Sequence, residues 1–421
     1  MNGMLYVYKT MPGKLQNEWR SSAIFILLII MMASLFVSRA VLSVSMMAFV
    51  AISFFHSDVK NQLRKFFRSP LLVGVSFLFL LPLLSGLWST DRQQWMDILR
   101  IKLPLLMLPL SFAGPFSFSK KKWEILAIIF IALVTAGSVW CLFHYAADPQ
   151  AVQEGYLRAK SVTTPLKNDH VRFSWMVSVA ILLSGWLGWE KKNQSRTMTG
   201  IFFVVAIWLG IFLHILAART GLFSFYIMVL IIAGWLMIRK LKTKYAAVLL
   251  FAIVVLPVTA WFTLPTFHNR VKYFLYEFEY LKKTHYLPGA NDAVRVISLK
   301  AGWELLKAHP FTGTGFGDVK GETRKWYAAA YPAMNERDKI DPSSEWLIYG
   351  VGCGWPGLLI FTMIMLVPFL CHGKNNLLWW GINVSAAFSF LFDIGLEVQF
   401  GVFLYAFCVL WWWKWLVPEK V

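Results

Sequence analysis

The sequence predicts an all-α polytopic membrane protein with about twelve transmembrane helices and a long, partly helical external loop before the tenth. Two observations predict this fold class. Of the 421 residues 58% are hydrophobic and only 15% are charged, whereas soluble domains carry about 25% charged residues. Apolar runs of roughly 16 to 25 residues also recur, and such runs cross the ~30 Å hydrocarbon core as helices. Strands of a membrane barrel would be shorter, near 10 residues.

The expected spans divide into nine before the loop, in residues 1–264, and three after it, in residues 345–421. The first nine lie at about 22–37, 40–55, 70–88, 98–114, 123–147, 172–189, 198–217, 220–238 and 245–264. The last three lie at about 346–370, 377–393 and 399–416. Residues 265–344 between them carry both signs of charge and many Tyr and Trp. We therefore expect a small folded cap.

Basic residues predict the orientation. Lys and Arg concentrate in one set of short connections, at residues 60–68, 120–122, 191–196 and 239–244. Short cytoplasmic loops are enriched in these residues, whereas long loops count little. With twelve spans, both termini are therefore expected to be cytoplasmic and the 265–344 loop external. Specific expectations are a cytoplasmic Met1, Lys240 and Val421 and an external Tyr286.

Other function classes find little support. The formal net charge of +19 invites a nucleic-acid interpretation, but the basic residues lie between apolar runs and no nucleic-acid-binding motif is present. The four Cys lie in or at the ends of apolar runs, so we expect no structural disulfide and no Cys-based metal site. No cofactor motif is evident. No internal repeat is evident either, which disfavours a transporter built from inverted repeats.

Three arginines on the expected external side are candidate anion ligands, because guanidinium binds phosphate in a bidentate manner. Arg219 lies in Leu-Ala-Ala-Arg-Thr-Gly-Leu between two apolar runs; it could equally snorkel to the interface. Arg172 begins a span, where an interfacial anchor is the alternative. Arg295 falls on the apolar side of a helical pattern at 294–309, so it needs an anionic partner. That partner is either a salt-bridging carboxylate or a bound phosphate.

Two further motifs surround these arginines. The glycines of Phe311-Thr-Gly-Thr-Gly-Phe-Gly317 would let backbone N–H groups approach an anion, although a plain turn after Pro310 explains them as well. Glu397, in Leu-Glu-Val-Gln-Phe-Gly, lies between the last two spans. Acidic residues at membrane depth usually face the bundle interior. Glu397 is expected either to pair with an arginine or to position an acceptor hydroxyl.

These motifs, in this order and membrane context, resemble the O-antigen ligase and O-antigen polymerase superfamily over about residues 165–415. The resemblance rests on the Ala-Arg-Thr-Gly turn, on the Arg295 helix running into His309-Pro310-Phe-Thr-Gly-Thr-Gly, and on the segment from Pro342 to Gly357. It implies a metal-independent glycosyltransferase in the bacterial inner membrane, with the long loop in the periplasm. The donor would be a glycan on undecaprenyl pyrophosphate, held by Arg219, Arg295 and Arg172.

Two adjacent positions depart from the family pattern, which begins the last motif with His-Asn where this chain has Ser343 and Ser344. Serine cannot replace imidazole as a general base at neutral pH. Glu345 and Glu397 are the expected substitutes, followed by Asp341. Either serine is otherwise expected to cap the helix that follows. Catalysis could also have been lost.

The resemblance leaves the acceptor open. A ligase transfers the glycan to an acceptor sugar such as lipid A-core, whereas a polymerase extends a growing lipid-linked polysaccharide. A transport or inactive homologue that binds a lipid-linked sugar is the alternative from another class. We expect membrane lipid as the surroundings, no cofactor and no nucleic acid.

Overall fold

The computed structural model describes residues 2–238, 243–283, 286–371 and 376–416, and within these ranges it is all helical, without strands. Seven helices in these ranges are long and apolar enough to cross a membrane. They are α1 (Asn2–Val37), α7 (Lys120–Ala147), α10 (His170–Lys191), α11 (Arg196–Leu216), α12 (Arg219–Ile238), α13 (Thr243–Thr263) and α17 (Glu345–Cys371). The expected all-α membrane fold is confirmed at this level. Met1, Lys240 and Val421 lie outside the described residues.

The other expected spans form shorter or broken helices. The 40–55 span is α2 (Arg39–Phe54), which turns by 110° into α3 (Val59–Arg68). The 98–114 span is divided at Leu103 into α5 (Arg92–Lys102) and α6 (Pro104–Phe112), because a proline lacks the N–H that would continue the helix. The remaining three are α4 (Pro70–Ser85), α18 (Leu377–Phe392) and α19 (Gln399–Leu416). The last is enclosed by the bundle, with Trp411 and Trp412 fully buried.

Small residues bring the central helices together. A Cβ on Gly221 of α12 would lie 2.5 Å from the Cβ of Ser174 on α10, so only glycine permits this approach. Ser178 of α10 donates a hydrogen bond to the Gly221 carbonyl at 2.7 Å. Close helix contacts through small residues and serine hydroxyls are typical of membrane bundles. They fix the start of α12, where Arg219 lies.

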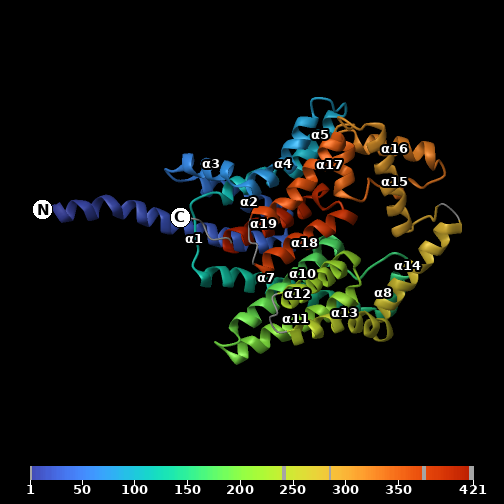
Figure 1. Cartoon of the computed structure of the whole chain (residues 1–421), viewed down its shortest axis with the longest axis horizontal. Coiled ribbons are helices and arrows are strands. Elements are labelled where there is room, and N and C mark those ends of the chain that lie inside the picture. The colour runs from blue at the N-terminus through green and yellow to red at the C-terminus, as the bar shows by residue number, and fades with distance from the viewer. Residues whose placement is uncertain (1, 239–242, 284–285, 372–375, 417–421) are drawn as a thin grey trace.

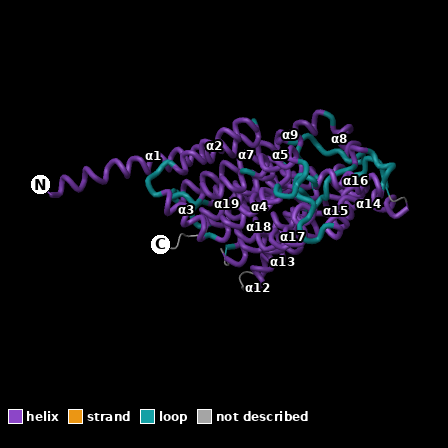
Figure 2. Tube along the Cα trace, turned by 90° about the horizontal axis from the view of Figure 1, so that it is seen from above, coloured by secondary structure: helices purple, strands orange, loops and turns teal. Residues whose placement is uncertain are grey.

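Residues 265–344 fold against one end of the bundle, opposite the N-terminal end of α1 (Figures 1 and 2). They contain α14 (Pro265–Lys283), α15 (Asp292–Ala308), α16 (Val319–Ala330) and the short η1 (Glu336–Asp338). We call this segment the cap. The short helices α8 (Pro149–Tyr156) and α9 (Pro165–Asn168) lie near the same end. The cap has its own apolar cluster, including Ala293, Ile297, Tyr327 and Met334.

A buried carboxylate fixes the start of α15. Glu277 of α14 is fully buried, and its two oxygens accept from the backbone N–H groups of Asn291 at 2.5 Å and Asp292 at 2.9 Å. A negative charge at a helix N-terminus satisfies free amides and interacts favourably with the helix dipole. The contact therefore locks α15 to α14 and sets the direction in which Arg295 projects.

Helix α17 reverses its direction in the middle. The Trp346 indole N–H donates to Thr362 Oγ1 at 3.0 Å, although sixteen residues of straight helix are about 24 Å long. The backbone leaves helical geometry at Cys353 and at Gly354, where φ is 68° and ψ is −165°. The expected span at 346–370 is thus found as one of the helices long and apolar enough to cross a membrane, but it is not one straight helix. A short helix from Glu345 runs to the reversal, and the second half begins at Trp355.

The glycine loop 311–317 closes this reversal. The amides of Thr314 and Gly315 donate to the carbonyls of Val351 and Gly352 at 2.8 and 3.1 Å. In return Trp355 N–H donates to Pro310 O at 2.8 Å. Backbone groups at a broken membrane helix need such partners, because lipid offers none. The cap and α17 are therefore a single hydrogen-bonded unit.

Candidate active site

Three charged side chains from three helices hold the connection between α18 and α19, residues 393–398, which contains the short helix η2 (Gly395–Glu397). Arg172 comes from α10, Lys102 from the end of α5, and Glu345 from the start of α17. Each contacts a different part of the connection. This irregular backbone is thus surrounded by protein and by charged side chains that contact it, as expected of non-helical backbone inside a membrane bundle.

Arg172 binds the first part of the connection. Its Nη2 lies 3.0 Å from Asp393 Oδ2 and donates to the Ile394 carbonyl at 3.1 Å. Asp169, which caps α10, lies 3.5 Å from its Nη1. The Nε of Arg172 is buried and has no hydrogen-bond partner among the described residues. Arg172, for which an interfacial anchor was the alternative, therefore contacts two carboxylates.

Lys102 binds the last part of the connection. Its side chain is fully buried, and its Nζ lies 2.5 Å from Glu397 Oε1. The same ammonium lies 4.9 Å from the ring of Tyr349 and 5.5 Å from that of Phe316. A buried ammonium requires such compensation because its transfer from water is costly. Glu397 therefore pairs with a lysine rather than with one of the expected arginines.

Glu345 binds the middle of the connection and is fully buried. Its Oε1 accepts from the Leu396 amide at 2.5 Å, while its Oε2 has no partner among the described residues. An oxygen with free acceptor capacity is what a general base needs. Asp341 lies in the same region, and burial together with the nearby charge of Glu397 raises its pKa.

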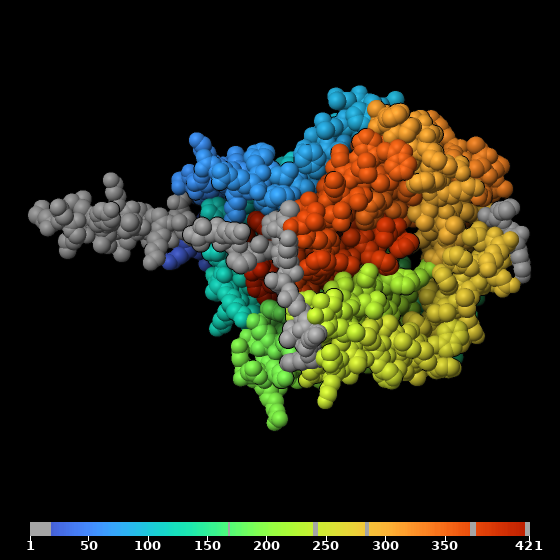
Figure 3. Space-filling view, in the orientation of Figure 1, coloured from blue at the N-terminus to red at the C-terminus, as the bar shows by residue number. Residues whose placement is uncertain are grey.

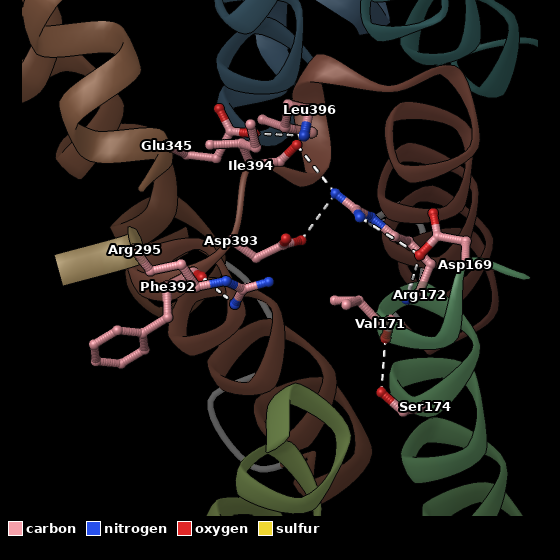
Figure 4. A network of polar contacts seen from close by, with 10 residues as sticks. All are labelled: Asp169, Val171, Arg172, Ser174, Arg295, Glu345, Phe392, Asp393, Ile394 and Leu396. Atoms are coloured by element: carbon pink, nitrogen blue, oxygen red, sulfur yellow. Dashed lines mark hydrogen bonds and ion pairs between the residues drawn. The ribbon is translucent and has the colours of Figure 1, made fainter. Parts of the chain in front are cut away.

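Arg295 approaches Asp393 from the other side (Figure 4). Its Nη1 donates to the Phe392 carbonyl at 3.3 Å, and its positive charge acts on Asp393 together with that of Arg172. Among the described residues no carboxylate forms an ion pair with Arg295. The expected salt bridge is thus not found, and the guanidinium keeps donor capacity for an anion.

Arg219 lies next to the same end of α15. Its Nη1 forms an ion pair with Asp292 Oδ2, one turn before Arg295, and the two arginines repel each other electrostatically. The structure therefore brings Arg219 and Arg295 together. In the space-filling view the molecule is hollowed between the red C-terminal helices and the yellow part of the cap (Figure 3).

A fourth arginine, Arg270 of α14, completes the cluster. It is 6% exposed, donates to the Lys160 carbonyl at 2.9 Å and lies 4.8 Å from the centre of the Tyr156 ring. Its Nη1 is buried without a hydrogen-bond partner in the described part of the chain. Burial lowers the pKa of Arg270. Several guanidinium groups held close together create a local positive potential that favours a polyanion.

The serines at the departing family positions do not cap α17. The Ser298 hydroxyl donates to Ser343 Oγ at 2.9 Å and accepts from the Ser343 amide at 3.1 Å. Ser344 Oγ donates weakly, at 3.5 Å, to the Phe390 carbonyl. The capping expectation is therefore wrong. Because α17 reverses, Ser343 precedes a short helix of about two turns that ends at the reversal.

The glycine loop does not offer an anion site. Its amides at 313–317 are all used: Gly313 donates to His309, Thr314 and Gly315 donate to α17, and Phe316 and Gly317 donate to Ser85 and Ser89. Gly313 and Gly315 have φ of 69° and 88°, which L-residues rarely adopt. The turn interpretation is the one that the structure supports.

A small hollow opens beside Arg172 between α10, α18 and α19. Its polar end is formed by Arg172 and Asp393, and Trp175, Phe390 and Tyr405 form apolar walls. Apolar walls with a few converging polar groups are the usual form of a ligand site. Within the described ranges, no group of three His, Cys, Asp or Glu side chains is arranged to hold a metal ion.

Sequence reasoning missed Lys102, Asp393, Asp292 and Arg270. Two signals were available. Lys102 falls inside the expected 98–114 span, and an ionisable residue within a span is itself a functional-site signal. Asp393, at the end of the expected 377–393 span, gives the same signal. Asp292 and Arg270 lie in the polar cap, where many other charges give no such contrast.

The chain was also compared with models of known protein families. The model of a family described as O-antigen ligase matches residues 204–362. The match includes Arg219, Arg295 and Glu345, and it ends before Asp393 and Glu397. No curated protein matches the chain.

Proposed function

We propose that the chain is a glycosyltransferase of the bacterial inner membrane, because a family model described as O-antigen ligase matches its residues 204–362. The glycan moves from undecaprenyl pyrophosphate to an acceptor sugar such as lipid A-core, on the periplasmic side where the cap lies. Both termini are cytoplasmic in this proposal, with twelve crossings in all. No metal or cofactor takes part.

The observation that carries the proposal is the convergence of Arg219 and Arg295 at the start of α15. Arg172 faces Arg295 across Asp393. A pyrophosphate leaving group gains negative charge as its bond to the sugar breaks, and fixed guanidinium groups in a site with little water stabilise that charge. In the proposal, donor phosphate replaces Asp292 as the partner of Arg219 and fills the free donor capacity of Arg295.

The acceptor hydroxyl attacks the anomeric carbon of the donor sugar. The new carbon–oxygen bond forms as the bond to the pyrophosphate oxygen breaks, and the hydroxyl proton passes to a carboxylate. Glu345 is the first candidate because its Oε2 is unpartnered. Glu397 is second because Lys102 already occupies its Oε1, and Asp341 is third. Ser343 serves as a structural residue bonded to Ser298.

The surface polysaccharide of a deletion strain tests this function and separates it from the polymerase alternative. Loss of a ligase leaves lipid A-core without attached chains, while lipid-linked polymer accumulates. Loss of a polymerase leaves core that carries a single repeat unit. An unchanged polysaccharide profile would contradict both enzymatic functions and favour a transport or non-catalytic binding role.

A further inference from the structure

Helix α15 presents an exposed stripe whose role the site does not explain. Val296, Lys300, Trp303 and Lys307 are exposed and follow one another at intervals of four, three and four residues, so they share one face. Trp303 is 45% exposed. The opposite face is buried in the cap and against α17, through residues that include Ile297, Ala301 and Leu306.

This stripe continues the outer surface of α17. The rings of Trp303 and Trp355 meet edge to face at 5.7 Å, and Trp355 begins the second half of α17. Below it a line of exposed apolar side chains follows the helix: Leu359, Met363, Leu366 and Leu370. Phe311, 83% exposed, adjoins the reversal at Gly354. Exposed apolar side chains thus follow α17 up to Trp355 and continue onto the cap at Trp303 and Phe311.

We infer that the α15 stripe, together with Phe311, is seated in the phospholipid headgroup layer of the membrane. Two features of the surface favour phospholipid as the occupant. Tryptophan is enriched at the membrane interface, where its ring is buried and its N–H stays hydrated. Lys300 and Lys307 flank Trp303, and lysines there place their stems along lipid and their ammonium groups among phosphates.

The seating has a geometrical consequence. Arg295 belongs to the same rigid helix as the stripe, so the lipid contact sets the depth at which its guanidinium is held. The cap would therefore rest on the membrane rather than project into water. This inference depends only on the fold and not on the proposed transfer reaction.

Photocrosslinking tests the contact without disturbing the native cysteines. Benzoylphenylalanine is placed at Val296, Trp303 or Phe311, and as a control at Lys325, whose side chain is 76% exposed on α16. The full chain is irradiated in nanodiscs of phosphatidylethanolamine and phosphatidylglycerol, and adducts are identified by mass spectrometry. We expect phospholipid adducts at positions 296, 303 and 311 to be about fivefold more frequent than at position 325.

The charge of the stripe is tested in the same nanodiscs. The double variant Lys300→Gln/Lys307→Gln should lower the phosphatidylglycerol share of the Trp303 adducts about twofold, because a polybasic surface attracts anionic lipid. Lipid adducts at 303 no more frequent than at 325 would overturn the inference. So would adducts that join two protein chains, since these would place a second copy on the stripe.

Discussion

Lys102 and Glu397 form a buried ion pair, 2.5 Å between Nζ and Oε1, across 295 residues of sequence. The lysine ends α5, just before the break at Leu103 and Pro104, and the glutamate lies in the connection that Arg172 and Glu345 also hold. The pair therefore ties the N-terminal half of the chain to the segment beside the candidate site.

Removing one partner of this pair should destabilise the protein strongly. Lys102→Met leaves an uncompensated carboxylate, and breaking a buried pair in this way costs about 3–5 kcal/mol. The double variant Lys102→Met/Glu397→Leu should cost less than the sum of the two single variants. Unfolding in detergent–denaturant titrations measures all three. Additive effects would show that the two charges are not coupled.

Glu345→Gln separates catalysis from structure. The glutamine keeps an oxygen that can accept from the Leu396 amide, so we expect near-native stability. If Glu345 is the general base, transfer in a reconstituted assay should fall about 10²- to 10⁴-fold. A Gln variant with full activity would exclude this role, and Glu397→Gln is the companion variant.

Ser343→His should destabilise rather than activate, because Ser343 is 7% exposed and packed against Ser298.

Arg219→Lys should impair transfer although the charge is kept. Lysine offers a point charge where a planar guanidinium donates in two directions, so the loss of one charge-assisted bond costs about 1.5–3 kcal/mol, or roughly ten- to a hundredfold in rate. The matched control is Arg158→Lys, whose side chain is 75% exposed in an ion pair with Glu154. Equal activities of the two variants would refute a pyrophosphate-binding role for Arg219.

Acid should loosen the cap through Asp318. Partial burial raises its pKa, but hydrogen bonds from Thr90 Oγ1 and N at 2.6 Å and from Asp91 N at 3.0 Å outweigh this and hold the pKa below its ordinary value. The stabilisation is therefore present above the ordinary pKa, about 3.9, and is lost as the pH falls through the lower folded value.

The comparison of wild type with Asp318→Asn between pH 3 and 7 measures this contribution. The variant should be less stable at neutral pH, and the difference should shrink in acid. Asp97→Asn, at an exposed pair with Arg100, serves as the control and should show no such trend. A difference that stays constant with pH would mean that the carboxylate charge does not stabilise the contact.

Thiol labelling tests the orientation. Lys325→Cys on the cap should react with a membrane-impermeant reagent in spheroplasts. Asn193→Cys, in the exposed connection between α10 and α11, should react only after permeabilisation. Cys141, Cys353 and Cys408 are buried and contribute little background, and Cys371 is replaced by serine in both variants. Reaction of both sites from the same side would invalidate the proposed topology.

Composition and run length were enough to predict the all-helical membrane fold, because burial of backbone polar groups leaves a long apolar segment few other structures. The helix carrying Arg295 was also predictable from its periodicity, and it spans Asp292–Ala308. The reversal of α17 was not, since hydropathy is the same for a straight helix and for one that folds back. The reversal lies at Cys353 and Gly354, and the positive φ of Gly354 is one that glycine adopts readily.

The arginines of the candidate site could be predicted from the sequence, but the residues that they contact could not. A motif fixes which residue types recur, whereas the contacts of Arg219 with Asp292, or of Glu397 with Lys102, depend on how distant segments pack. The serines illustrate the same limit. Their local sequence favours a cap, but Ser298 of another helix offers Ser343 a closer partner.

The reversal of α17 has a consequence for how the chain is made. Val351 and Gly352 would each leave a carbonyl without a partner in a non-aqueous setting, at a cost of several kcal/mol per group, until residues 314 and 315 supply their amides. Those residues leave the ribosome first. The cap is therefore synthesised before the carbonyls with which it pairs. If it folds late, residues 345–371 insert as one straight helix.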